Sequence, residues 1–178
     1  MVINGGAAVQ GLILSLLYLA FLGLLCFPLG RLLARLPLEA GRPPFAPRPW
    51  ERSGRIYEKI SVRAWQKRVP DVSRMFPGAI PKKQAAGSSD PAALQVLLRE
   101  TCVAELVHWL LCLAGLPLIG FWKGGWGLAL YLIYVILGNL PFIIIQRYNR
   151  PRLLKICALR GRQERGRREN ECFDPQLQ

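Results

Sequence analysis

Three long apolar stretches, separated by polar and basic segments, dominate the pattern of this 178-residue chain. Residues 7–30 and 126–145 contain no charged side chain, and residues 101–121 contain one carboxylate and one histidine. A membrane-spanning helix needs about 20 mostly apolar residues, so each stretch is long enough to cross a bilayer. The pattern predicts an all-α integral membrane protein, with three transmembrane helices in a single membrane domain over residues 1–178.

The segment between the first two spans carries its own signals. Residues 37–49 contain five prolines, which predicts a stiff, extended connector. In residues 50–68, apolar positions fall near one side of a helix and basic positions occupy much of the rest. This pattern predicts an amphipathic helix lying on the cytoplasmic leaflet, although a soluble helix packing on another loop would show a similar pattern.

Proline and glycine mark the boundaries of the later helices. Residues 69–83 are rich in turn formers and residues 85–89 predict a flexible loop. Asp90 and Pro91 then form an N-cap followed by proline at the first helical position, which places the start of the second helix before the bilayer. Pro151 disfavours helix just before it, so the third helix is expected to end near residues 146–149. The basic tail after Arg160 is expected to be disordered.

Positive charge is distributed unevenly about the three spans. Of 24 lysines and arginines, 14 lie in residues 31–99, nine follow Ile145, and only Lys123 separates the second span from the third. The positive-inside rule therefore predicts a multi-pass protein of the cell membrane, with the N-terminus outside and the loop 31–99 and C-terminal tail 147–178 in the cytoplasm. Its net charge of +13 then indicates contact with anionic lipid head groups rather than with nucleic acid.

Polar residues inside the second and third spans form a predicted layer. Thr101, Glu105, His108 and Cys112 are spaced by four, three and four residues, so they share one face of a helix. His108, the only histidine, lies seven residues inside Thr101, and Asn139 lies seven residues inside Gln146. At 1.5 Å per residue, both are about 10 Å deep. We therefore expect His108 and Asn139 in one layer, with Glu105 shallower and close enough to His108 to pair with it.

Two interpretations of this layer are possible. The polar groups could simply hydrogen-bond between helices and hold them together, which contributes modestly in membranes. Ionisable residues within spans are more often functional, so we favour a functional site over structural pairing. A metal is not expected, because Glu105 and His108 supply only one Glu-x-x-His pair and a di-iron site needs two. The five cysteines form no ligand pattern and are expected to be free thiols.

Two strings resemble a known family. Residues 100–109 (ETCVAELVHW) and 139–153 (NLPFIIIQRYNRPRL) resemble the glycosyl-diaponeurosporenoate acyltransferases, which include the last enzyme of staphyloxanthin synthesis. Residues 65–71 (WQKRVPD) and 81–83 (PKK) are similar to two further family stretches. The resemblance implies transfer of a fatty acyl group to a sugar hydroxyl of a membrane glycolipid, such as a glycosylated carotenoid. It implies an acyl-CoA or acyl-carrier donor as co-substrate and no other cofactor.

The polar layer contains groups suited to that chemistry. Acyl transfer to an alcohol needs a base for the hydroxyl and donors for the developing oxyanion. We assign His108 as the base and Glu105 as its orienting partner. The candidate substrate-binding residues are Asn139, Gln146, Arg147, Asn149 and Arg150. The alternative is a non-catalytic protein, either a membrane scaffold or assembly factor or a lipid-binding or transport subunit.

Overall fold

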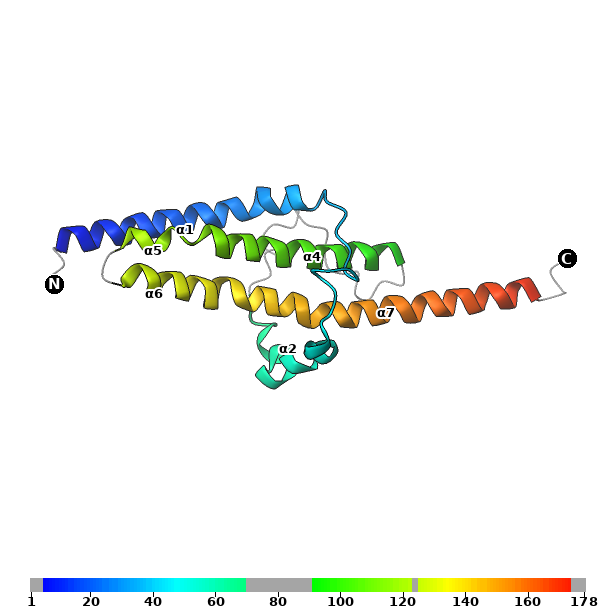
Figure 1. Cartoon of the computed structure of the whole chain (residues 1–178). Coiled ribbons are helices and arrows are strands. Elements are labelled where there is room, and N and C mark those ends of the chain that lie inside the picture. The colour runs from blue at the N-terminus through cyan, green and yellow to red at the C-terminus, as the bar shows by residue number, and fades with distance from the viewer. Residues whose placement is uncertain (1–4, 70–90, 123–124, 174–178) are drawn as a thin grey trace. The chain divides into compact units, whose positions relative to one another are not determined.

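The computed structural model of the chain describes residues 5–69, 91–122 and 125–173, and every regular element in these ranges is helical (Figure 1). The all-α class is therefore confirmed. Three helices are long and apolar enough to cross a membrane: Gly5–Leu33, Ala92–Phe121 and Trp126–Arg167. The expectations for residues 70–90, which include the turn-rich segment, the flexible loop and the Asp90 cap, lie outside the described residues.

The chain divides into two compact units. Unit 1 comprises residues 1–38 and 102–146, and unit 2 comprises residues 39–101 and 147–178. Two helices contribute to both units: α4 (Pro91–Ala114) and α7 (Leu140–Phe173). Helix α4 begins at Pro91, as the sequence predicts.

Unit 1 is built from helices that run side by side (Figure 1). They are α1 (Gly5–Leu33), the C-terminal part of α4, α5 (Leu118–Phe121), α6 (Trp126–Ile133), a π-helix η3 (Tyr134–Asn139) and the first residues of α7. Leu22 and Leu33 of α1 are buried together with Val107 and Leu111 of α4, and Tyr134 packs against them. This apolar contact joins the first two spans along their length.

The second span is interrupted between α4 and α5, at Gly115–Pro117. Because Pro117 has no N–H, nearby amides shift to closer acceptors, and the N–H of Leu118 donates to Gly115 O at 3.0 Å. The carbonyl of Ala114 instead accepts the Tyr18 hydroxyl at 2.7 Å, and that of Cys112 accepts the Tyr131 hydroxyl at 3.3 Å. Tyrosines from the other two spans thus satisfy carbonyls that an apolar solvent would leave without a donor.

The third span begins with a close approach of two backbones. Gly125 turns the chain with φ +86°, and α6 then runs back along α5. A Cβ on Gly127 would lie 2.5 Å from the carbonyl oxygen of Ile119, so only glycine fits there without moving the backbone.

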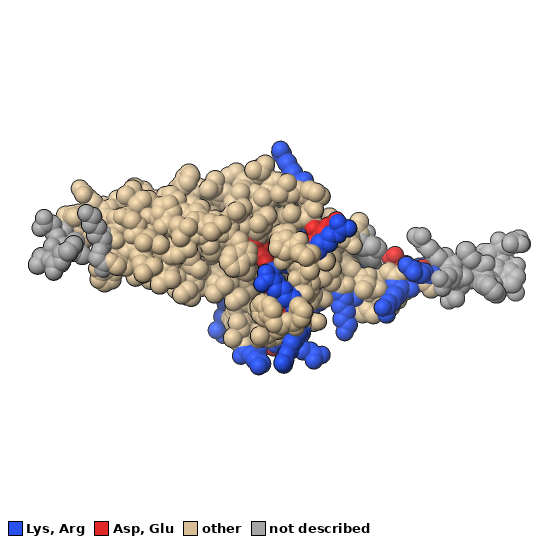
Figure 2. Space-filling view, in the orientation of Figure 1, with Lys and Arg blue, Asp and Glu red and all other residues tan. Residues whose placement is uncertain are grey.

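The surface of unit 1 exposes more apolar side chains than the surface of a water-soluble protein does. Leu17 is 65% exposed and Leu24 and Leu137 are both 70% exposed. On the face drawn in Figure 2 these helices are tan along most of their length, whereas lysine and arginine side chains gather over η1 and α7. The exposed apolar belt and the grouped charges are what a bilayer-spanning protein requires.

Unit 2 begins with the proline-rich segment, which is not the extended connector that the sequence predicts. It folds into turns in which the N–H groups of Phe45 and Ala46 both donate to Arg42 O at 2.9 Å. Ala40 and Phe45 are buried. Burial of these side chains favours a folded segment over the extended form that proline alone would prefer.

The single amphipathic helix expected over residues 50–68 is also replaced by shorter pieces. They are η1 (Pro49–Ile60), a 3₁₀ segment kinked at residues 52–54, and α2 (Val62–Trp65). Gly54 has φ +88°, and a Cβ there would lie 3.1 Å from Tyr148 O. The close approach of the Tyr148 backbone requires glycine in the left-handed conformation. A residue in this conformation interrupts the continuous helix that the sequence predicts.

Helix α7 corrects the expected end of the third helix and the expected disorder of the tail. It continues through Pro151 to Phe173. A proline inside a helix removes one backbone hydrogen bond and costs about 3 kcal/mol. Tyr148, Arg150 and Leu153 are buried on either side of Pro151, and this packing offsets the lost hydrogen bond.

Candidate functional site

The polar layer of unit 1 joins the second and third spans. His108 on α4 lies with its Nδ1 atom 3.0 Å from Oδ1 of Asn139, the last residue of η3. The prediction that these two residues share one layer is confirmed. Asn139 is 1% exposed, whereas His108 is half-buried.

The π-helix positions Asn139. In η3 the N–H of Leu140 donates to Val135 O, five residues earlier, rather than four as in an α-helix. The side-chain nitrogen of Asn139, Nδ2, donates to Tyr134 O at 3.1 Å. Such wide turns are rare in proteins, and those that occur are often found at functional sites. Here the wide turn holds a buried amide beside an imidazole.

An aromatic ring fixes the plane of the imidazole. The ring of Phe142, in the first turn of α7, stacks on His108 with centroids 4.6 Å apart and planes 9° apart. His108 is therefore held on one side by a hydrogen bond and on one face by a ring. Part of the His108 side chain remains accessible, since the residue is only half-buried.

The predicted face of α4 points inward. Thr101, Glu105 and Cys112 are all buried, with Glu105 2% exposed. Glu105 lies three residues before His108, about one turn away on the same face. A carboxyl group and an imidazole in an apolar setting are suited to general acid–base chemistry. Among the described residues, no group of three histidine, cysteine, aspartate or glutamate side chains could hold a metal ion.

A second polar cluster lies in unit 2, around Arg147. Its guanidinium group donates to Glu51 Oε1 at 2.9 Å and to Pro44 O at 3.0 Å. Glu51 also accepts the Tyr57 hydroxyl and the Arg48 backbone N–H, both at 2.8 Å. Burial alone would raise the pKa of Glu51, but these donors together hold it below its ordinary value.

Arg150 is the largest of the fully buried side chains that the structure describes, with 1% exposed. Its Nε and Nη2 atoms donate to Thr101 Oγ1 and Thr101 O at 3.0 and 2.8 Å, and Nη1 donates to Phe45 O at 2.9 Å. The guanidinium also lies 5.4 Å from the centre of the Phe45 ring. Arg150 therefore fastens the proline-rich segment to the beginning of the second span.

The remaining predicted binding residues are more accessible. Asn149 donates to the side-chain oxygen of Gln66 at 3.4 Å, and Gln146 is half-buried. The structure thus unites His108 with Asn139 in unit 1, and it gives the predicted arginines protein acceptors in unit 2. A role in substrate binding stays a prediction for all five candidates, which are Asn139, Gln146, Arg147, Asn149 and Arg150.

Three residues that contact these clusters, Tyr134, Phe142 and Glu51, were not predicted from the sequence. Tyr134 contributes only its carbonyl to Asn139, and a backbone acceptor leaves no residue signature. Phe142 lies three residues after Asn139, at helical spacing, and this spacing was the available signal. Glu51 pairs with an arginine 96 residues away, a contact that no local pattern indicates.

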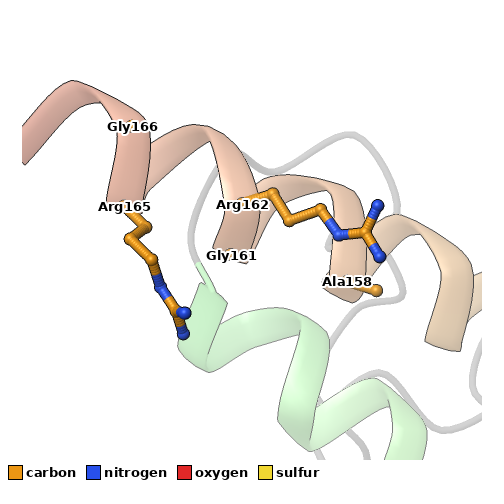
Figure 3. A pocket seen from close by; sticks show the side chains of 5 residues that line it. All are labelled: Ala158, Gly161, Arg162, Arg165 and Gly166. Carbon is orange, nitrogen blue, oxygen red and sulfur yellow. The ribbon is translucent and has the colours of Figure 1, made fainter. Parts of the chain in front are cut away.

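The structure also has a shallow hollow of about 410 Å³ along α7 in unit 2 (Figure 3). Arg162 and Arg165 border it, and Gly161 and Gly166 leave the helix backbone uncovered. No carboxylate is among the lining residues. The hollow contains none of the predicted site residues.

Comparison with known proteins gives one consistent family. Residues 42–159 match the family model of glycosyl-4,4'-diaponeurosporenoate acyltransferase. The protein of that name from Staphylococcus haemolyticus (strain JCSC1435) is 32% identical over 117 residues, which are 65% of this chain and 66% of that protein. The one from Staphylococcus aureus (strain N315) is 32% identical over 124 residues, 68% of this chain and 71% of that protein. The chain thus matches about two thirds of these relatives' length, and no solved structure matches it significantly.

Proposed function

Because the chain belongs to the glycosyl-4,4'-diaponeurosporenoate acyltransferase family, we propose that it transfers a fatty acyl group to a sugar hydroxyl of a membrane glycolipid. The names of its relatives specify a glycosylated diaponeurosporenoate as their acceptor. A glycosylated, carotenoid-like lipid is accordingly the acceptor class that we propose. The observation that carries the proposal is the pair of His108 on the second span and Asn139 on the third, with Nδ1 and Oδ1 3.0 Å apart.

His108 is the proposed general base. The acceptor hydroxyl loses its proton to the neutral imidazole as its oxygen attacks the carbonyl carbon of an acyl thioester. A carbon–oxygen bond forms, the carbon–sulfur bond breaks, and the imidazolium returns the proton to the leaving thiolate. The products are a sugar ester and a free thiol, so no oxidant or metal is needed. An acyl-CoA or an acyl-carrier thioester would supply the acyl group.

Glu105 is the proposed orienting partner of His108. Its carboxylate, buried one turn earlier on α4, would stabilise the imidazolium that forms in the transition state. Donation by Asn139 to the oxyanion or to the sugar stays a prediction.

Four residues that follow on the third span are proposed to bind the acyl donor. Gln146, Arg147, Asn149 and Arg150 lie where the span is expected to meet the cytoplasm, and arginines pair well with phosphates. Arg147 and Arg150 already hold the proline-rich segment, so a bound donor would have to share them. Replacing both by glutamine should raise the Michaelis constant of the donor more than that of the acceptor, and equal effects on both would limit these arginines to holding the segment.

The test is acyl transfer to a glycolipid acceptor by purified, monodisperse protein in lipid nanodiscs. General base catalysis contributes about 10²–10⁴-fold, so His108→Ala should lower turnover by that factor. Glu105→Gln keeps the shape of the side chain and should lower turnover less. Ser15→Ala is the matched control, because Ser15 is a buried polar residue of a span that bonds to Gly11 O at 2.7 Å.

The outcomes separate the functional classes. Full turnover in Ser15→Ala with a loss in His108→Ala would support the proposal. Near-normal turnover in His108→Ala would remove His108 as the base. Absence of transfer by the wild-type protein with every thioester and glycolipid supplied would favour the scaffold or lipid-binding alternative.

A further inference from the structure

The side-chain amide of Asn139 has a defined direction. Its nitrogen faces a carbonyl oxygen, Tyr134 O, at 3.1 Å. A carbonyl can only accept, so the NH₂ group must lie on that side. The amide oxygen therefore lies on the other side, 3.0 Å from His108 Nδ1.

This direction determines which nitrogen of His108 carries the proton. An amide oxygen can only accept, so Nδ1 must donate a hydrogen to it. In the neutral ring only one nitrogen is protonated, and the lone pair then resides on Nε2. We infer that Asn139, oriented by the carbonyl of Tyr134 in the π-helix, holds His108 in its Nδ1–H tautomer and leaves Nε2 as the atom that takes the acceptor's proton.

The inference makes Asn139 a positioning residue, which acts through His108. The hydrogen bond from Nδ1 sets the tautomer, while the Phe142 ring, 4.6 Å away and nearly parallel, restricts rotation of the imidazole. Both constraints come from one short segment of the third span. The same logic operates in other enzymes, where a partner on Nδ1 keeps Nε2 available as the base. The role of Nε2 as the reacting atom rests on the proposed function, whereas the tautomer of His108 does not.

The tautomer can be measured without any assay of activity, because His108 is the only histidine in the chain. Full-length protein carrying ¹⁵N-labelled histidine and a purification tag without histidine would be placed in nanodiscs. Nitrogen NMR distinguishes a protonated from an unprotonated ring nitrogen. We expect a protonated Nδ1 and an unprotonated Nε2 in the neutral ring. A neutral ring with its proton on Nε2 would overturn the inference.

Two variants test whether the side-chain oxygen of Asn139 sets the tautomer of His108. Asn139→Leu removes the acceptor at similar volume, so the proton should redistribute to Nε2 in a large fraction of molecules. Asn139→Asp keeps an acceptor and should keep the proton on Nδ1. An unchanged tautomer in Asn139→Leu would overturn the assignment of Asn139, whereas an unchanged tautomer in the control Ser15→Ala is expected.

Turnover provides the second measurement. Loss of the correct tautomer can reduce catalysis by up to about 10⁴-fold, so Asn139→Leu should lower turnover at least about tenfold, and Asn139→Asp should recover part of the loss. If His108→Ala abolishes turnover but the wild-type ring carries its proton on Nε2, the inference fails and the proposed function stands. If the tautomer is as inferred but His108→Ala is fully active, the proposed function fails.

Discussion

At the scale of single residues, a buried carboxylate in unit 2 is satisfied by several donors at once. Glu51 is 1% exposed and accepts hydrogen bonds from Arg147, Tyr57 and the Arg48 backbone at 2.8–2.9 Å. Removing a charge from such a pair leaves its partner buried without compensation, which is strongly destabilising. Glu51 therefore couples η1, the segment before it and α7 within this unit.

This arrangement predicts a pH dependence of stability. Burial tends to raise the pKa of Glu51, but its hydrogen-bond donors and the charge of Arg147 lower it below the ordinary value. A carboxylate with a lower pKa in the folded state adds stability that is fully present above its unfolded pKa, about 4.3, and is lost as pH falls through the folded pKa. Wild-type protein should therefore exceed Glu51→Gln in thermal midpoint at pH 7, and the difference should shrink as the solution is acidified below about pH 4.

The matched control is Glu58→Gln. Glu58 pairs with Arg152 at 2.6 Å, but both side chains are about half exposed, at 52% and 42%. Exposed pairs contribute little, so this variant should resemble the wild type at every pH. A constant difference between wild type and Glu51→Gln from pH 7 to pH 3 would contradict the role of the ionised carboxylate.

The residue-scale predictions from sequence succeeded where counting along a helix was sufficient. The fixed rise per residue predicts that His108 and Asn139 lie at the same level of two antiparallel helices, and the two side chains do meet. The direction of the Asn139 amide depends on a backbone carbonyl in a π-turn, and no residue pattern indicates that turn. The partners of Arg147 and Arg150 depend on long-range folding of the proline-rich segment, which no local pattern indicates. The sequence therefore predicted that these side chains bind a ligand, and it did not predict their protein acceptors.

At the scale of elements, the break in the second span shows how a helix can be interrupted inside a bilayer. The Tyr18 hydroxyl donates to the carbonyl of Ala114, which lies at the end of α4 just before Gly115–Pro117. The hydroxyl is supplied by α1, a different span. The break therefore also ties α1 to α4.

The hydrogen bond from Tyr18 to Ala114 O predicts an energetic coupling between Tyr18 and Pro117. Tyr18→Phe removes only the hydroxyl and should lower the unfolding free energy in detergent by about 0.5–1.5 kcal/mol. Pro117→Ala restores an N–H and lets the helix continue, so the amide of Leu118 can return to the carbonyl of Ala114. In that background Tyr18→Phe should cost less, and a double-mutant cycle measures the difference. Equal costs in both backgrounds would show that the hydroxyl does not compensate for the break.

The element boundaries were the least predictable feature. The start of α4 at Pro91 was predictable from the local sequence pattern, but the continuation of α7 through Pro151 was not, because packing of Tyr148, Arg150 and Leu153 outweighs a local preference. The kink at residues 52–54 likewise depends on a backbone that arrives from α7. Tertiary contacts decided both outcomes.

At the scale of the whole molecule, charge and hydropathy agree on a membrane protein. Within the part of the chain that the structure describes, three helices are long and apolar enough to span a bilayer. Of the 24 lysines and arginines, 23 lie in two segments that three spans would place on the same side. We propose that this side is cytoplasmic.

The orientation can be tested by labelling with a membrane-impermeant thiol reagent. In a variant without its five native cysteines, Gly6→Cys should react in intact cells, because the N-terminus is expected outside. Arg42→Cys, in the basic loop, should react only after the cells are permeabilised. Reaction of Arg42→Cys in intact cells would reverse the orientation.

The central claim is acyl transfer to a glycolipid at the His108 layer. Membranes containing the wild-type protein or His108→Ala would be incubated with an isotopically labelled acyl thioester and a glycolipid acceptor, and the extracted lipids analysed by mass spectrometry. We predict a labelled, base-labile sugar ester with the wild-type protein and at least about a hundredfold less with His108→Ala. Equal amounts of ester from both proteins, or none from the wild type with any glycolipid and thioester offered, would contradict the claim.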